Sequence, residues 1–174
     1  MEERTGEAYE LGERLTVAGT KLQPGDAAPA FALDSFDGEA MQTVRLADSA
    51  GSVRLLNVVN SLDTPVCHVE THRWETMRGD LPENVQVYTV SMDLPFAQAR
   101  WQNAENVTHR ALSAHRDEQF GRDYGVLIKE WRLLQRAVFV IDANDRIAHA
   151  EYVADQMHEP DYAAALTAAR RAAG

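Results

Sequence analysis

Cys67 is the only cysteine in this 174-residue chain, and its position favours reactivity. It follows Thr64 and Pro65, a pair typical of a helix start, because threonine caps well and proline at the first helical position loses no hydrogen bond. Cys67 is then expected in the first turn, where free backbone N–H groups and the helix dipole favour negative charge. A thiol in that place should ionise more readily than a free thiol, and the thiolate is the reactive form.

Position alone leaves two interpretations of Cys67 open. A lone cysteine in a globular domain is commonly a small buried hydrophobic residue. At a polarised helix start it can equally be a nucleophile. The rest of the chain has to decide between packing and chemistry.

The segments on either side of Cys67 have the patterns of a strand and a helix. Residues 53–59 are almost continuously apolar, which is typical of a strand buried on both faces, and residues 65–78 have helical spacing. Further strands are expected at residues 85–91, 107–112, 137–141 and 147–153, and further helices at residues 96–103, 117–124 and 160–172. Cys67 therefore lies where a central strand leads into a helix, a usual place for a functional site.

The first third of the chain is expected to contain short strands. Residues 9–17 predict a β-hairpin that turns at Gly12, after a flexible tail at residues 1–6. Residues 21–29 are expected to be a loop, followed by strands at 31–33 and 41–46. The whole order predicts an α/β fold, a central mixed β-sheet flanked by helices, built as one domain from residues 1–174.

Composition argues against several classes of partner. The formal net charge is −10, which disfavours nucleic acid or an anionic membrane surface as partner, because both require a basic face. A single cysteine permits no intramolecular disulfide, which is typical of a reducing compartment. The first residues are polar and acidic, and no apolar run approaches the length of a membrane span. These features predict a cytoplasmic protein.

Five ordered blocks of sequence resemble the peroxiredoxin superfamily, and in particular its bacterial thiol peroxidase branch. Thr64-x-x-Cys67 alone would be weak support, but the other matches keep the family's order and spacing over nearly the whole chain. The blocks are SLDTPVC (61–67), SMDLPFAQ (91–98), DYGVLI (123–128), RAVFVID (136–142) and EPDY (159–162).

The resemblance implies a thioredoxin-like fold with an added N-terminal hairpin. It implies reduction of hydrogen peroxide and organic hydroperoxides by a peroxidatic cysteine, which corresponds to Cys67, assisted by Thr64 and Arg136. It also implies a homodimer whose contact lies near the active site, and no cofactor. Chemically, both helpers suit the role: a hydroxyl can donate to the sulfur or the peroxide, and a guanidinium stabilises developing negative charge. Without the resemblance, Thr64 would be interpreted as an N-cap and Arg136 as a charge at the mouth of a buried strand.

The chain departs from the family pattern at two positions. Asn60 stands where the motif has a proline that shields the sulfur, so a wetter thiolate is expected. Gln102 stands after Arg100-Trp101, where this branch usually has a second, resolving cysteine. The sulfenic acid formed at Cys67 then requires an external thiol reductant, either a thioredoxin-like protein or a low-molecular-weight thiol. The prediction is a one-cysteine mechanism, and the alternative is a peroxide-sensing or redox-signalling protein with little turnover.

His68 and His72 are spaced one helical turn apart next to Cys67. They raise the possibility of a metal site, but neighbouring residues on a helix point in different directions, and the sequence places no third ligand. The prediction is therefore that no metal is bound there. The three tryptophans are expected to pack in the core rather than to line a pocket.

Overall fold

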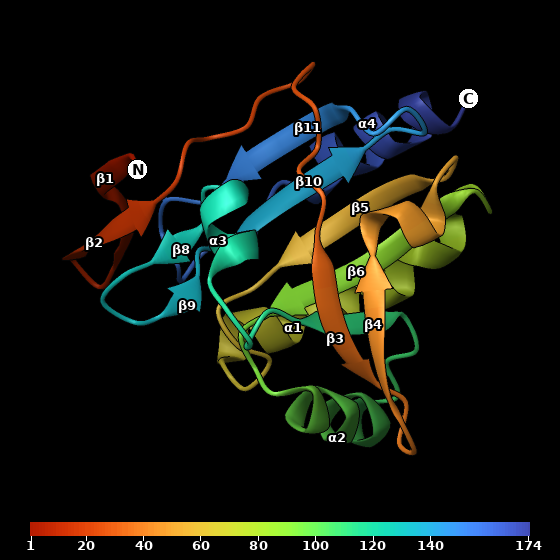
Figure 1. Ribbon diagram of the computed structural model, residues 1–174, viewed down its shortest axis with the longest axis horizontal. Coiled ribbons are helices and arrows are strands. Elements are labelled where there is room, and N and C mark those ends of the chain that lie inside the picture. Colours follow the sequence, from red (N-terminus) through yellow and green to blue (C-terminus); the bar gives the residue numbers. More distant parts are fainter.

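The computed structural model describes residues 1–174 and contains two β-sheets with four α-helices (Figure 1). A seven-stranded sheet has the order β11-β10-β5-β6-β7-β3-β4, with β5, β6 and β7 parallel and the other pairings antiparallel. Its strands are β3 (Ala32–Phe36), β4 (Met41–Arg45), β5 (Val53–Val58), β6 (Val85–Ser91), β7 (Arg110–Ser113), β10 (Ala137–Ile141) and β11 (Ile147–Tyr152). The predicted α/β class with a central mixed sheet is confirmed.

Helices cover both faces of this sheet. Trp74 of α1 packs with Ala165 and Ala169 of α4 against one face, and Phe120 of α3 packs against the other. In Figure 1, α3 lies in front of the sheet and α4 behind it, while α2 lies beyond its lower end. The helices are α1 (Pro65–Met77), α2 (Pro95–Glu105), α3 (Gln119–Asp123) and α4 (Tyr162–Ala173), with short 3-10 turns at Leu46–Ser49 and Arg78–Asp80.

β5 is an inner strand of the large sheet, as its apolar sequence predicts. All six of its residues are buried, including the polar Arg54 and Asn57. β6 pairs with it in parallel and β10 in antiparallel register, with Ala137 opposite Val58. The carboxyl ends of β5 and β6 therefore meet the start of β10 at one edge, where loops leading into helices bring side chains together.

A second sheet joins the N-terminal hairpin to two short strands from later in the chain, in the order β1-β2-β8-β9. The predicted hairpin is present, but β1 begins at Glu3, inside the segment expected to be a flexible tail. Arg4 explains the difference, because its buried guanidinium donates to the carbonyls of Gly19 and Gly125 and ties the segment down. The strands are β1 (Glu3–Glu10), β2 (Glu13–Ala18), β8 (Leu127–Ile128) and β9 (Leu133–Leu134).

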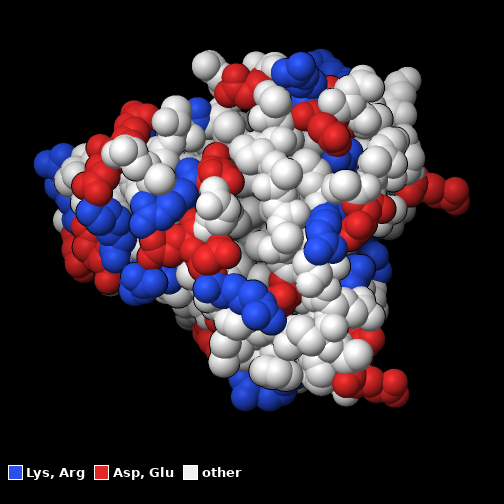
Figure 2. All heavy atoms as spheres, in the orientation of Figure 1, with Lys and Arg blue, Asp and Glu red and all other residues white.

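Two further features bear on the predicted partners. None of the helices combines the length and the apolar character needed to cross a membrane. On the face shown in Figure 2, lysine and arginine side chains lie interspersed with aspartate and glutamate side chains.

Glu75 anchors the C-terminal half of α1 to the segment before β7. Its carboxylate accepts hydrogen bonds from the backbone N–H groups of Thr108 at 3.0 Å and His109 at 3.1 Å, and from both of their side chains. Burial alone would raise the pKa of Glu75, but these hydrogen bonds outweigh it and lower the pKa to about 2. The helix that carries Cys67 is thus fixed at its far end by an ionised group.

Candidate active site

Cys67 lies in the first turn of α1, as predicted. Thr64 occupies the N-cap position with φ −84° and ψ 145°, and Pro65 is the first helical residue. The Cys67 side chain is 0% exposed and belongs to a small apolar cluster. The other members of that cluster are Val59, Leu62, Trp101 and Val107.

Arg136 reaches the sulfur of Cys67 from the adjacent antiparallel strand. It immediately precedes β10, whose first residue Ala137 pairs with Val58 at the end of β5. Its Nη1 donates to Cys67 Sγ at 3.2 Å, and the side chain is 1% exposed. Two of the three predicted site residues are therefore in direct contact, and a buried guanidinium stabilises negative charge on the sulfur.

Glu70, one turn after Cys67 on α1, shares the same guanidinium. Its carboxylate accepts from Arg136 Nη1 and is fully buried. Burial raises the pKa of Glu70 to about 8, although the charge of Arg136 opposes this shift. Burial acts to lower the pKa of Arg136, but the neighbouring Glu70 and Cys67 outweigh burial and raise that pKa. Because Glu70 resists ionisation near neutral pH, it leaves much of the Arg136 charge for the sulfur.

Asn60 and Gln156 complete a polar network behind the sulfur. Asn60 Nδ2 donates to the Leu134 carbonyl at 2.6 Å and to Gln156 Oε1 at 3.1 Å, while Asn60 Oδ1 accepts from Arg136 Nη2 at 3.3 Å. Gln156 binds Arg136 twice more, through its carbonyl at 2.7 Å and through its Oε1, which accepts the Arg136 backbone N–H at 2.9 Å. Both terminal nitrogens of the guanidinium therefore have fixed partners: Cys67 and Glu70 at Nη1, and Asn60 and Gln156 at Nη2.

The expected wetter thiolate is not observed. Asn60 is 4% exposed and Gln156 1% exposed, so no open water surface replaces the ring of the missing proline. The Asn60 amide instead forms hydrogen bonds with protein groups, and its Oδ1 lies 4.0 Å from Cys67 Sγ. Asn60 thus places a buried, hydrogen-bonded amide where the family motif has an apolar proline ring.

An Asn60→Asp variant should react with peroxide roughly tenfold to a hundredfold more slowly at neutral pH, because a carboxylate at this place competes with the thiolate for Arg136. Stopped-flow measurement of the second-order rate constant tests this, with Asn60→Ala as the uncharged control. The pH profile of the reaction should move to higher pH in Asn60→Asp alone. Equal rates for Asn60→Asp and the parent would contradict the placement of Asn60 beside the reacting charge.

Thr64, the third predicted residue, lies close in sequence but does not bind the sulfur in this structure. Its hydroxyl donates to the Ser61 carbonyl at 2.9 Å and does not cap α1, whose N-cap interaction is made by the backbone alone. Its carbonyl accepts the His68 N–H at 2.9 Å. A hydroxyl needs only to rotate to change its acceptor, so Thr64 can donate a hydrogen bond to a group that enters beside the first turn of α1.

Asp93 fixes the loop that precedes α1. Its Oδ1 accepts from Ser61 Oγ at 2.7 Å, and its Oδ2 accepts from the Leu62 N–H at 2.9 Å and from Ser91 Oγ at 2.7 Å. It lies two residues after the end of β6, at the edge where the carboxyl ends of β5 and β6 meet. The parallel pairing of two apolar strands was the sequence signal that could have identified it.

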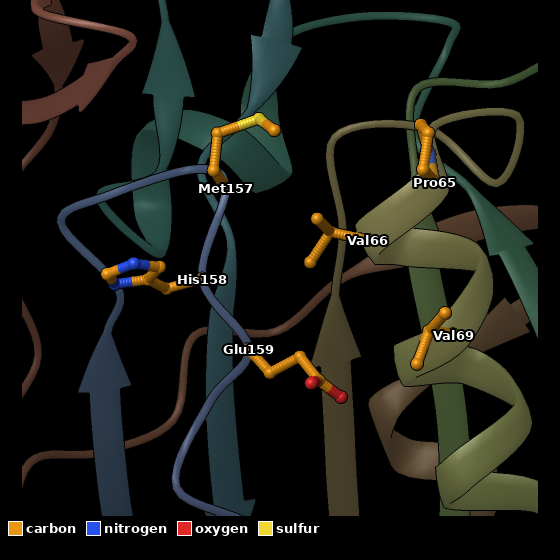
Figure 3. A pocket seen from close by; sticks show the side chains of 6 residues that line it. All are labelled: Pro65, Val66, Val69, Met157, His158 and Glu159. Atoms are coloured by element: carbon orange, nitrogen blue, oxygen red, sulfur yellow. The ribbon is translucent and has the colours of Figure 1, made fainter.

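A groove of about 490 Å³ lies beside the first two turns of α1. Figure 3 shows Pro65, Val66 and Val69 on α1 facing a segment that carries Met157, His158 and Glu159. Cys67 does not line the groove, in keeping with its complete burial. Access of a peroxide to the sulfur therefore requires a displacement of the first turn or of the facing segment.

Comparisons with known proteins agree with this site and fold. The model described as the AhpC/TSA family matches residues 24–150. Thiol peroxidase of Halalkalibacterium halodurans is 45% identical over 162 residues, which cover 92% of this chain and 95% of that protein. Thiol peroxidase of Bacillus subtilis is 41% identical over 160 residues, or 91% and 93% of the two chains.

The similarity extends to three dimensions. The crystal structure of a peroxiredoxin-like protein from Aquifex aeolicus superposes with a TM-score of 0.83 and 32% sequence identity, covering 97% of this chain and 96% of that one. The thioredoxin-like arrangement implied by the sequence is thereby confirmed. With a cysteine at the start of α1, an arginine on its sulfur and relatives of this kind along most of its length, the chain belongs to the AhpC/TSA family, in the thiol peroxidase branch of the peroxiredoxin superfamily.

Proposed function

We propose that the protein is a thiol-dependent peroxidase that reduces hydrogen peroxide and organic hydroperoxides at Cys67, with Arg136 and Thr64 assisting. The observation that carries the proposal is the contact of 3.2 Å between the Arg136 guanidinium and the only sulfur nucleophile of the chain. The names of the relatives from Halalkalibacterium halodurans and Bacillus subtilis support the same activity.

The first half-reaction follows from the charges at the site. The Cys67 thiolate attacks one peroxide oxygen, so an S–O bond forms as the O–O bond breaks. The other oxygen leaves as hydroxide or alkoxide and takes up a proton to depart as water or an alcohol. The sulfur is oxidised by two electrons to a sulfenic acid. Negative charge spreads from sulfur over both oxygens in the transition state, and Arg136 is the fixed cation nearest to it.

The second half-reaction needs an electron donor from outside the chain. Cys67 is the only cysteine, and Gln102 occupies the position where the branch usually carries a second one. An external thiol attacks the sulfenic sulfur and releases water, which leaves a mixed disulfide. A second thiol then attacks that disulfide, restores the Cys67 thiol and leaves with the first as an oxidised disulfide. The donor is a low-molecular-weight thiol or a thioredoxin-like protein.

The groove beside α1 supports the inclusion of organic hydroperoxides. Val69 is 45% exposed and Met157 46% exposed, so an apolar substrate tail finds contacts there that hydrogen peroxide does not use. Such contacts lower KM for an organic substrate without changing the chemistry at the sulfur.

A homodimer with its contact near the active site, a single domain and a cytoplasmic location complete the proposal. Leu94 and Phe96 are 54% and 58% exposed, shortly after the aspartate that fixes the loop before α1, and the Phe96 ring meets that of Phe36 edge to face with centroids 5.0 Å apart. Exposed apolar residues in one place are typical of an interface.

The presence of one cysteine and no disulfide agrees with a reducing compartment.

Steady-state peroxide consumption with a panel of donors tests the activity. Catalytic turnover is expected with at least one of glutathione, another small thiol or a reduced thioredoxin. Without a donor, peroxide consumption should stop once Cys67 itself has been oxidised. The alternative of a peroxide sensor predicts one rapid, stoichiometric oxidation and no turnover with any donor. That second outcome would overturn the proposed enzyme while leaving the reactivity of Cys67 intact.

A further inference from the structure

His68, His72 and Glu105 form a cluster that the proposed peroxidase chemistry does not use. The two histidines lie one turn apart on α1, and Glu105 is the last residue of α2. Their ligand atoms all lie within 4.8 Å of one another. The sequence placed no third ligand beside the histidine pair, because Glu105 is more than thirty residues away and reaches it only through the packing of α2.

The spacing is close to that of a metal centre. Glu105 Oε2 lies 3.1 Å from His72 Nε2 and 3.7 Å from His68 Nε2. Ligand atoms at the ~2.0 Å bonds of tetrahedral zinc are separated by roughly 3.3 Å, so both nitrogens already lie near the required distance from the carboxylate. The cluster needs only a small adjustment of exposed side chains to surround an ion.

The electrostatic surroundings also call for a cation. Glu105 carries its charge in the last turn of α2, where the carbonyl ends of the helix disfavour an anion, and that turn has no basic residue. No lysine or arginine forms an ion pair with it, and its partners within 4.0 Å are the two histidines alone. The side chains are 35–40% exposed, so an ion can enter and keep water in its remaining positions.

We propose that His68, His72 and Glu105 bind a transition-metal ion of the zinc class and thereby link α1 to α2. Two imidazoles and one carboxylate are a donor set that suits Zn²⁺, with the fourth position open to water. Because Cys67 directly precedes His68, the bound ion restrains the turn of α1 that carries the sulfur.

Binding replaces the hydrogen bond between His72 and Glu105 and breaks a second one, which provides a signature. Trp101 Nε1 donates to His68 Nδ1 at 3.3 Å, and the two rings meet edge to face. When Nε2 of His68 binds the ion, Nδ1 carries the proton and no longer accepts this hydrogen bond. The indole must give up a long, weak contact, so the tryptophan emission should change with zinc occupancy, and a Trp101→Phe variant should lose that change.

Calorimetric titration of the intact protein with Zn²⁺ tests the site. One ion per chain is expected, with affinity reduced tenfold or more in His72→Ala and in Glu105→Gln, and with a rise in melting temperature on zinc addition that both variants lose. His158→Ala is the matched control, since His158 pairs with Asp155 at 3.5 Å without a second imidazole, and it should bind like the parent.

A thiol is an alternative zinc ligand, so the same titration is made with Cys67→Ser. Unchanged affinity is expected, because Cys67 is buried on Arg136 rather than directed to this cluster. Loss of binding in Cys67→Ser would overturn the proposal, as would parent-like binding in both His72→Ala and Glu105→Gln, or no binding by the parent protein. None of these outcomes depends on peroxidase turnover.

Discussion

Replacement of Arg136 by methionine should slow the reaction with peroxide by about a hundredfold or more, because it removes the one fixed cation on the sulfur. It should also lower the free energy of unfolding by ~1–3 kcal/mol, since the buried Glu70 carboxyl is left without its hydrogen-bond partner. Stopped-flow kinetics of the folded protein and urea unfolding measure the two effects separately.

The double variant Arg136→Met/Glu70→Gln separates catalysis from stability. At pH values high enough for Glu70 to ionise without its partner, Glu70→Gln should restore part of the lost stability, but it should not restore the rate. Arg54→Met is the matched control. Arg54 is likewise fully buried and bound to a carboxylate, that of Asp145, at the opposite end of β5. Its loss should reduce stability and leave the rate per folded molecule unchanged. A fast double variant would contradict the role of Arg136.

The stability of Arg136→Met should depend on pH in a defined direction. Burial raises the pKa of Glu70 to about 8, from an ordinary value near 4.5, and removing the arginine takes away an interaction that lowers it. The folded variant therefore binds a proton that the unfolded chain releases between these values, so its stability should fall as pH rises through that window. The parent should show the same fall up to about pH 8, where its own Glu70 ionises, whereas in the variant the fall should continue above pH 8. Unfolding of both proteins below and above pH 8 measures this, and an identical pH dependence above pH 8 would contradict it.

Local sequence patterns suffice to predict elements whose residues lie close together in the chain. Apolar periodicity located β5, β6 and β10, and the Thr64-Pro65 signal located the start of α1, because these depend on residues close in the chain. The strands β8 and β9, of two residues each, were not predicted, since two residues display no periodicity. The segment expected as a tail is held by Arg4 through partners that no local pattern could indicate.

The same distinction applies to the site. Cys67 was identified from its position, whereas Arg136 was assigned by family resemblance and only the antiparallel pairing of β5 with β10 explains why it reaches the sulfur. Glu70 and Gln156 were missed, because a buried polar residue looks like an exposed one until its partners are known. Asn60 was recognised as unusual, but its effect was predicted wrongly, since its amide is consumed by groups distant in sequence. Tertiary pairing, rather than local propensity, decides these roles.

Cys67→Ser should abolish peroxide reduction, with a loss of roughly 10⁴-fold or more, because a hydroxyl at this place is neither ionised nor nucleophilic enough to replace the thiolate. The variant should fold like the parent, since the exchange of sulfur for oxygen leaves the volume and the hydrogen-bond partners nearly unchanged. Peroxide consumption with the best donor and a thermal melt test both statements. Residual turnover in Cys67→Ser would place the chemistry elsewhere in the chain.

In the parent protein, one equivalent of peroxide should produce a single product by intact mass, with one oxygen atom added at Cys67, and addition of a small thiol should convert it to a mixed disulfide and then to the free thiol. Excess peroxide without a donor should carry the sulfur on to the sulfinic acid, because no second cysteine intercepts the sulfenic acid. A dominant disulfide between Cys67 residues of two chains would contradict the external-thiol scheme. That outcome is disfavoured by the complete burial of Cys67, since two such sulfurs approach each other only if both first turns open together.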